Sequence, residues 1–163
     1  MSLDFFQNNC KESPRNDEIF GLCDAQDGTK AYSDTENTDD WIATVKNEKR
    51  RSVTFTAIDK CVLLDEEFPG KGRCDGMLTS SELLYLVELK NQEPPWRPDA
   101  IEQLESTIEL LKANHDISTF KKRKAYACNK KRNAFVVLDN EFNKKFMRRT
   151  SFRIDIQAEI VVV

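Results

Sequence analysis

Three residues have the types and spacing needed to bind a metal ion and assist hydrolysis: Asp75, Glu88 and Lys90. Glu88 and Lys90 lie two residues apart at the end of an apolar run, so in a strand their side chains leave the same face. Burying these two charges costs several kcal/mol unless each finds a partner, a metal or solvent, and a simple salt bridge could supply that compensation. Asp75 favours a functional interpretation, because two carboxylates at one sheet end repel each other unless a cation lies between them.

The oxygen ligands of this set favour a hard cation. The chain offers no Cys or His pattern for softer metals, so Mg²⁺ or Mn²⁺ is expected, with waters and a substrate phosphate completing its coordination. Such an ion polarises phosphoryl oxygens and lowers the pKa of bound water, and a neighbouring lysine positions that water or stabilises developing charge. The residues therefore predict metal-dependent hydrolysis of a phosphodiester, with Lys90 as the lysine.

The surrounding pattern predicts the elements that position these residues. Alternation from residue 52 onward predicts one or two strands over 53–64, then a return strand over 73–79 and a central strand over 83–90 that is covered on both faces. Asp99 and Glu102 have the spacing of a capping box, and apolar residues at helical intervals then predict a helix that ends near Asn114.

Weaker patterns predict the rest of the chain. Residues 24–40 are acidic and polar and are expected to be loop, and residues 41–50 are expected to form a short helix. Further strands are expected over 124–128 and 134–138, and the regular alternation of 152–160 predicts a half-solvated antiparallel strand. At 163 residues the chain fits one domain.

The segments 72–78 (GRCDGML) and 86–90 (LVELK), with their order of helix, hairpin, strand and helix, resemble the D…ExK signature and common core of the PD-(D/E)XK nuclease superfamily. The resemblance covers residues 39–126. It implies an α/β fold in a single domain, with a restriction-endonuclease-like mixed β-sheet flanked by helices. Residues 39–163 would form this nuclease core with basic C-terminal strands, after an acidic, partly irregular segment over 1–38.

The resemblance also implies roles for individual residues. Asp75 and Glu88 would bind the metal together with the main-chain carbonyl of Leu89, and Lys90 would assist the attacking water. Gln103 resembles the helix glutamine of the RecB-like branch, which orients the lysine or the phosphate; a plain exposed helix residue is the alternative.

Two departures from the family pattern are visible. Cys74 stands where the family often has proline, and the expected acid on the first helix is not fixed by the sequence. Glu48 is the first candidate for that acid as a metal ligand, and Glu18 is the second.

The charge of the chain is unevenly distributed. Residues 1–90 carry 11 Lys and Arg against 18 Asp and Glu, whereas residues 91–163 carry 14 against 10. Such a basic half favours a polyanion partner, although a solvated face that balances the acidic half is the alternative.

Trp96 lies in a proline-rich loop, where it would stack on a base or pin its own loop to the core. The residues expected to bind nucleic acid are Lys121, Lys122, Arg123, Lys124, Lys130, Lys131, Arg132 and Trp96.

Composition excludes several other classes of protein. Five cysteines without a CxxC pair, together with a single histidine, argue against a zinc cluster and against Ser-His-Asp or Cys-His catalysis. The odd number of cysteines is expected to be reduced and mostly buried. No apolar run approaches the roughly 20 residues of a membrane span, and no secretory signal is recognised, so a cytoplasmic location is expected.

The leading hypothesis is therefore a metal-dependent nuclease acting on DNA, in restriction, repair or defence. A second hypothesis keeps the PD-(D/E)XK fold without the reaction, as a binding or immunity protein that acts on a protein partner. A third is a small enzyme subunit that needs a larger complex, and a homodimer also stays open.

Overall fold

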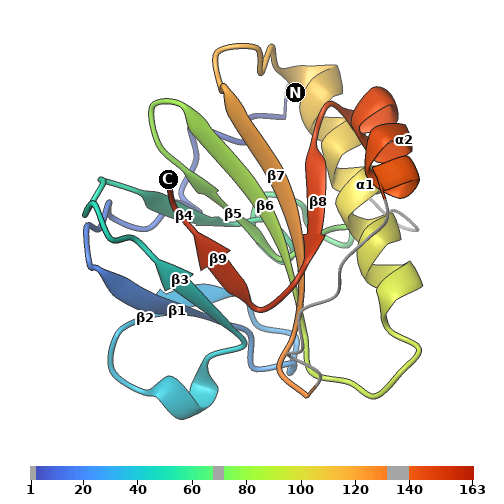
Figure 1. Cartoon of the computed structure of the whole chain (residues 1–163). Coiled ribbons are helices and arrows are strands. Elements are labelled where there is room, and N and C mark those ends of the chain that lie inside the picture. Colours follow the sequence, from blue (N-terminus) through green and yellow to red (C-terminus); the bar gives the residue numbers. More distant parts are fainter. Residues whose placement is uncertain (1–2, 68–71, 132–139) are drawn as a thin grey trace.

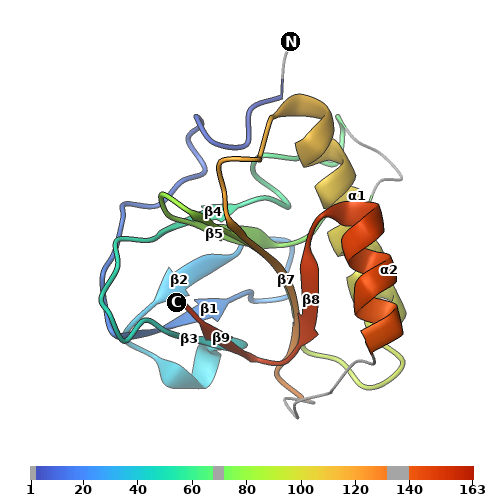
Figure 2. The same cartoon turned by 45° about the horizontal axis from the view of Figure 1, so that its top comes forward.

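Two β-sheets pack face to face, and two α-helices cover the outer face of the larger sheet (Figure 1). The structure is a computed structural model and describes residues 3–67, 72–131 and 140–163. Within these ranges the chain forms one α/β domain of two mixed sheets. The turned view in Figure 2 shows α1 and α2 side by side on one face, with the smaller sheet on the other.

The larger sheet has five strands in sequence order: β4 (Thr54–Ala57), β5 (Gly76–Thr79), β6 (Leu83–Lys90), β7 (Lys122–Asn129) and β8 (Arg153–Ile156). The first three run antiparallel, and β6, β7 and β8 run parallel. Parallel neighbours need a crossover, and α1 (Arg97–Asn114) and α2 (Asn140–Thr150) supply these two connections.

The smaller sheet has the order β2 (Tyr32–Asp34), β1 (Ile19–Cys23), β3 (Ala43–Lys46) and β9 (Glu159–Val161). Its pairs are antiparallel except for β3 and β9, which are parallel. A short 3-10 helix, Thr38–Asp40, precedes β3. The acidic N-terminal segment thus contributes β1 and β2 to the domain.

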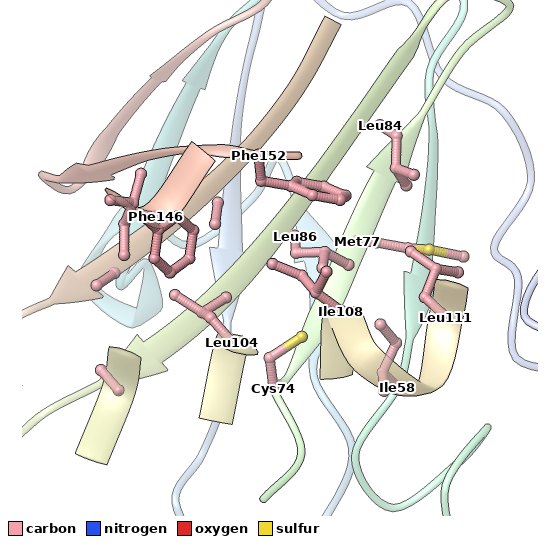
Figure 3. Close-up of a cluster of buried hydrophobic side chains, with 14 of the residues drawn as sticks. Ile58, Cys74, Met77, Leu84, Leu86, Leu104, Ile108, Leu111, Phe146 and Phe152 are labelled. Atoms are coloured by element: carbon pink, nitrogen blue, oxygen red, sulfur yellow. The ribbon is translucent and has the colours of Figure 1, made fainter. Parts of the chain in front are cut away.

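Strand β6 separates two hydrophobic cores, and all eight of its residues are buried, as a central strand predicts. Leu84 and Leu86 point to the helix side, where they join side chains such as Leu104 and Ile108 of α1 (Figure 3). Tyr85 and the other odd-numbered residues of β6 point to the smaller sheet. Because side chains alternate along a strand, Glu88 and Lys90 fall on the same face as Leu84 and Leu86, toward α1.

The elements predicted around the candidate residues are confirmed: β4, β5, β6, α1 and β7 lie where the pattern places them. The prediction of a capping box at Asp99 and Glu102 is wrong. Helix α1 begins at Arg97, two residues before Asp99, and its N-cap residue Trp96 makes no side-chain capping bond. Residues 61–64 form a turn rather than a second strand. The strand expected over 134–138 lies outside the described residues.

Three other local predictions are wrong. Residues 43–46 form a strand rather than a helix, because Ala43 and Val45 alternate inward with the outward Thr44 and Lys46. Residues 24–40 contain β2 and the 3-10 helix as well as loop. The expected antiparallel strand over 152–160 is instead β8 and β9, each parallel to its partner in a different sheet. Helix α2 was not predicted.

The prediction of reduced cysteines is wrong for one pair, since Cys10 and Cys61 form a disulfide with their Cα atoms 5.8 Å apart. The N-terminal segment runs antiparallel beside β4, where the Ala57 N–H donates to the Cys10 carbonyl, and this pairing brings Cys10 to the turn after the strand. Cys23, Cys74 and Cys128 are free and buried, as expected.

Candidate active site

Asp75 and Glu88 face each other at the end of the β5–β6 hairpin. Gly76, the first residue of β5, pairs with Val87, and Asp75 and Glu88 lie just beyond this pair and line the same pocket. The Asp75 N–H donates to the Val87 carbonyl at 3.1 Å, and a side-chain hydrogen bond joins the Asp75 and Glu88 carboxyls. The two side chains are 8% and 2% exposed, so two adjacent carboxyl groups are held in a largely dry environment.

Lys90 completes the cluster at the last position of β6. Its Nζ atom lies 3.0 Å from Glu88 Oε2, and the lysine is itself buried. The Leu89 N–H donates to Asp75 Oδ2 at 2.6 Å, so the backbone between Glu88 and Lys90 holds the opposite carboxyl. The strand thus supplies two side chains and a peptide group to one site.

Helix α1 supplies Gln103 to the same site. Thr107 Oγ1 accepts from the Cys74 N–H at 2.8 Å and donates to the Gln103 carbonyl at the same distance, which links the residue before Asp75 to the helix. A Cβ atom on Gly72 would lie 3.3 Å from Gln103 Cα, so a glycine allows this close approach. The chain entering β5 is therefore fixed against the helix turn that carries Gln103.

These residues line a polar pocket of about 180 Å³. The segment that follows β1 closes one side of it, and the Gln26 side-chain amide donates to the Leu89 carbonyl at 3.3 Å. The pocket lining comprises Asp24, Gln26, Gly28, Thr29, Asp59, Lys60, Asp75, Glu88, Leu89, Lys90 and Gln103.

Burial dominates the electrostatics of both carboxyls. It raises the pKa of Glu88 from 4.5 to about 7, and the Lys90 ammonium partly opposes this shift. The pKa of Asp75 is raised well above its ordinary value by burial, then by the charge of Glu88 and by a side-chain hydrogen bond with Asp24. A nearby cation would relieve both shifts, because it favours the ionised carboxylates.

Two acceptor atoms at this site are buried without a hydrogen-bond donor from the described residues: Glu88 Oε1 and Gln103 Oε1. Buried acceptors normally have a partner, and a hard cation can satisfy oxygen atoms of this kind. Asp75, Glu88 and the Leu89 carbonyl form an all-oxygen donor set that fits Mg²⁺ or Mn²⁺. In the described ranges no group of three or more His, Cys, Asp or Glu side chains is placed to hold a metal, so such an ion would depend on a main-chain oxygen, water and phosphate.

The acid that sequence reasoning missed is Asp24. Glu48, the first candidate, is exposed in the turn after β3, and Glu18 forms an ion pair with Arg50 at 3.2 Å; neither lines the pocket. The prediction for Glu48 is wrong because residues 41–50 form no helix. Asp24 follows directly after the apolar run of β1, and the end of a buried strand was the signal that could have identified it.

The basic residues are divided between the two ends of β7. Lys122 pairs with Leu83 and Asn129 pairs with Lys90, so the first cluster lies about seven residues, or roughly 23 Å, from the pocket. Arg123 donates to the main-chain oxygens of Ser151 and Phe120, each at 3.0 Å. These contacts show a structural use of Arg123 within the first cluster, which comprises Lys121, Lys122, Arg123 and Lys124.

The second basic cluster lies at the end of β7 beside the candidate site. The Lys130 N–H donates to the Lys90 carbonyl at 2.9 Å, and Lys131 follows it. Asn129 ties this end to the chain leaving β6 through two hydrogen bonds with the Gln92 backbone, at 3.2 and 2.8 Å. Arg132 lies outside the described residues.

Trp96 does not have the surface position that base stacking requires. It is 3% exposed and packs into the helix-side core at the start of α1. The prediction that it binds nucleic acid is wrong, and the alternative, in which it pins its own loop to the core, is confirmed.

Three comparisons, with protein families, with curated proteins and with solved structures, gave no match to this chain. In the part of the chain that the structure describes, neither helix has the length and apolar character needed to cross a membrane. The arguments about function therefore depend on the geometry of the site.

Proposed function

We propose that the chain is a metal-dependent nuclease that hydrolyses phosphodiester bonds of nucleic acid, with DNA as the first substrate to test. One observation carries the proposal: the carboxyls of Asp75 and Glu88 are buried beside each other, with an acceptor atom of Glu88 lacking a donor among the described residues. The ion pair with Lys90 alone would leave that oxygen unsatisfied, whereas a divalent cation, or a proton shared with Asp75, would satisfy it.

Each residue of the site has a role in this proposal. Asp75, Glu88 and the Leu89 carbonyl hold Mg²⁺ or Mn²⁺, which supplies Lewis-acid polarisation of the phosphate and lowers the pKa of water. Asp24, from the segment after β1, lines the same pocket and forms a side-chain hydrogen bond with Asp75, so it positions that ligand. These groups approach from β5, β6 and the segment after β1, so the fold fixes their mutual positions.

The lysine and the glutamine complete the site. Lys90 is held in place by Glu88, and its ammonium orients the attacking water and stabilises the negative charge that develops on the phosphate. Gln103 of α1 lines the pocket, and the N–H groups of its side-chain amide can bind a phosphate oxygen there. Both residues act by positioning and electrostatics, the main protein contributions to this class of reaction.

The test is a cleavage assay with Mg²⁺ or Mn²⁺ on single-stranded DNA, duplex DNA and RNA. We expect Lys90→Met, which keeps most of the stem and removes the charge, to lower the rate by roughly 10²- to 10⁴-fold. Asp75→Asn and Glu88→Gln should lower it at least as far. Lys49→Met, at an exposed lysine in the turn after β3, is the matched control and should cleave at the parental rate.

A second candidate function is a binding protein for a protein partner. The Lys90–Glu88 ion pair and the bond from Leu89 to Asp75 favour it, because they hold the cluster together through protein groups alone. In that case the parent would bind no divalent cation and cut none of the substrates, and Lys90→Met would only lower stability, by about 3 to 5 kcal/mol for a buried pair.

A further inference from the structure

Two aromatic side chains are exposed beside the candidate active site. The chain has two tryptophans and three tyrosines, and Trp96, Tyr85 and Tyr126 are buried. Tyr32 is 38% exposed on β2, and Trp41 is partly exposed just before β3. The smaller sheet therefore presents an aromatic pair that neither hydrophobic core requires.

Each aromatic residue lines a pocket, and neighbouring pockets share lining residues. A pocket of about 320 Å³ is lined by Tyr32 and shares Asp24 and Gln26 with the catalytic pocket. A further pocket of about 310 Å³ is lined by Trp41 and shares Ile42 and Lys130 with the first. In this series of three pockets, shared lining residues link the catalytic pocket to that of Tyr32, and that of Tyr32 to that of Trp41.

The Trp41 ring is held rigidly in this series. Its indole N–H donates to Asp34 at 2.9 Å. A Cβ atom added to Gly21 would lie only 2.0 Å from Trp41 Cγ, so the ring packs directly against the backbone of β1 at a position that only glycine allows. A side chain fixed on one face and open to a pocket on the other loses little conformational entropy when a planar ligand stacks on it.

One cation beside the rings, Lys130, can contact a phosphate. Lys130 lines both outer pockets, and its Nζ donates to the Asp39 carbonyl, which leaves ammonium N–H groups for a phosphate. Among the nearby acids, Glu159 forms an ion pair with Lys46, and Asp34 accepts from Trp41 and from backbone N–H groups. Asp24 and Asp40, which also line the Tyr32 pocket, accept from the Gln26 N–H and from the Asn37 side chain. Neutral base faces could thus lie on the rings while Lys130 contacts the backbone between them.

We propose that Tyr32 and Trp41 are stacking platforms for successive bases of a single-stranded nucleic acid, which runs from the catalytic pocket over Lys130. This inference rests on the proposed nuclease function and defines its substrate. Bases must be unpaired and unstacked to lie on protein rings, so the surface selects single strands over duplexes and tolerates many sequences.

The test measures binding of a short oligothymidylate in metal-free buffer, where no cleavage occurs. Trp41→Ala should weaken binding by about 5- to 100-fold, and Trp41→Phe, which keeps an aromatic face, should retain most of the affinity. Gly21→Ala should also weaken binding, because it displaces the ring without removing it. Lys130→Gln should weaken binding where the control Lys49→Gln does not. Circular dichroism and thermal melts establish that each variant is folded.

A fluorescence measurement reports the stacking directly. The oligonucleotide should quench the emission of the parent, and Trp41→Phe should remove that quenching, since the remaining Trp96 is buried. Equal oligonucleotide affinity in the parent and Trp41→Ala, or tighter binding of a duplex than of the single strand, would overturn the proposal.

A small substrate separates this inference from the proposed function. A p-nitrophenyl ester of thymidine monophosphate is too short to reach Trp41, so Trp41→Ala should cleave it at the parental rate while cleaving oligonucleotides more slowly. If the cleavage of every substrate depends on Lys90 and none of it depends on Trp41, the stacking platforms are rejected and the nuclease function stands. Trp41-dependent binding by a protein that cleaves nothing would reject the nuclease and leave the platforms. A parent that neither binds nor cleaves would reject both.

Discussion

The carboxyls of Asp75 and Glu88 are joined by a side-chain hydrogen bond at the end of the β5–β6 hairpin, in the pocket that Gln103 of α1 also lines. Both carboxyls are buried, and the pKa of each is raised, mainly by burial. Lys90 is one cation beside two acids, so its charge does not compensate both of them when both are ionised. The pair therefore favours either a bound proton or a further cation.

The first prediction concerns stability against pH. Glu88 has a folded pKa of about 7 and an ordinary value of 4.5, so the folded state holds the proton more tightly than the unfolded state. This contribution is fully present below pH 4.5 and is lost as pH rises through 7. The free energy of unfolding should fall by about 3 kcal/mol between pH 5 and pH 8, measured by urea denaturation.

Glu88→Gln is the control for this effect, because it removes the titration and keeps the shape. The variant should lose the part of the pH dependence that Glu88 contributes, while Asp75, whose pKa is also raised, keeps its own, and it should be more stable than the parent at pH 8. Acids such as Asp34 and Asp116 have a lowered pKa, so they act at lower pH. A parent whose stability stays level or rises from pH 5 to pH 8 would contradict the prediction.

The second prediction concerns stabilisation by metal. Mg²⁺ or Mn²⁺ should raise the melting temperature more at pH 8 than at pH 5, since protons compete for Asp75 and Glu88 at the lower pH. At a concentration about 100 times Kd, binding would add about 2.7 kcal/mol. Asp75→Asn should abolish the effect, whereas Glu82→Gln, at an exposed acid before β6, should keep it. An equal shift in Asp75→Asn would place the ion elsewhere.

The local sequence was sufficient to predict the elements that carry Asp75, Glu88 and Lys90. Strand β6 is apolar on both faces and is buried on both faces, so its pattern had one interpretation. The helix pattern of α1 was equally clear, because its apolar residues recur on the side that packs on the sheet. These elements are regular, and their burial follows from neighbouring positions in the chain.

What the sequence could not predict depends on contacts between distant segments. Asp24 reaches Asp75 only because β1 ends beside the hairpin, and the disulfide of Cys10 and Cys61 forms only because the N-terminal segment runs beside β4. The two tryptophans show the same limit. Trp96 in a proline-rich loop and Trp41 in a polar region look similarly placed in sequence, yet packing buries the former and leaves the latter partly exposed.

The third prediction follows from the disulfide. Cys10 and Cys61 are 51 residues apart, and a cross-link that closes a loop of this length stabilises a protein by about 4 kcal/mol in the chain-entropy treatment. Reductant should lower the free energy of unfolding by about that amount, and Cys10→Ser with Cys61→Ser should make the protein insensitive to reductant. Thiol titration of the unfolded, unreduced protein should find the three free cysteines, and a count of five would contradict the cross-link.

The fourth prediction separates the two basic clusters. The guanidinium of Arg123 donates to the main-chain oxygens of Ser151 and Phe120, and these hydrogen bonds join the two segments. Arg123→Gln should therefore cost about 2 kcal/mol of unfolding free energy in urea denaturation.

Nucleic-acid binding gives the complementary measurement. Arg123→Gln should leave both the affinity and its dependence on salt unchanged, because the residue lies at the far end of β7 from the pocket. Lys130 lies beside Lys90 and lines both outer pockets, so Lys130→Gln should weaken binding and reduce the slope of log affinity against log salt by about one. Affinity is measured by fluorescence anisotropy over a range of salt concentrations. If Arg123→Gln reduces that slope and Lys130→Gln does not, the phosphate backbone lies at the opposite end of the sheet, and a strand passing over Tyr32 and Trp41 is excluded.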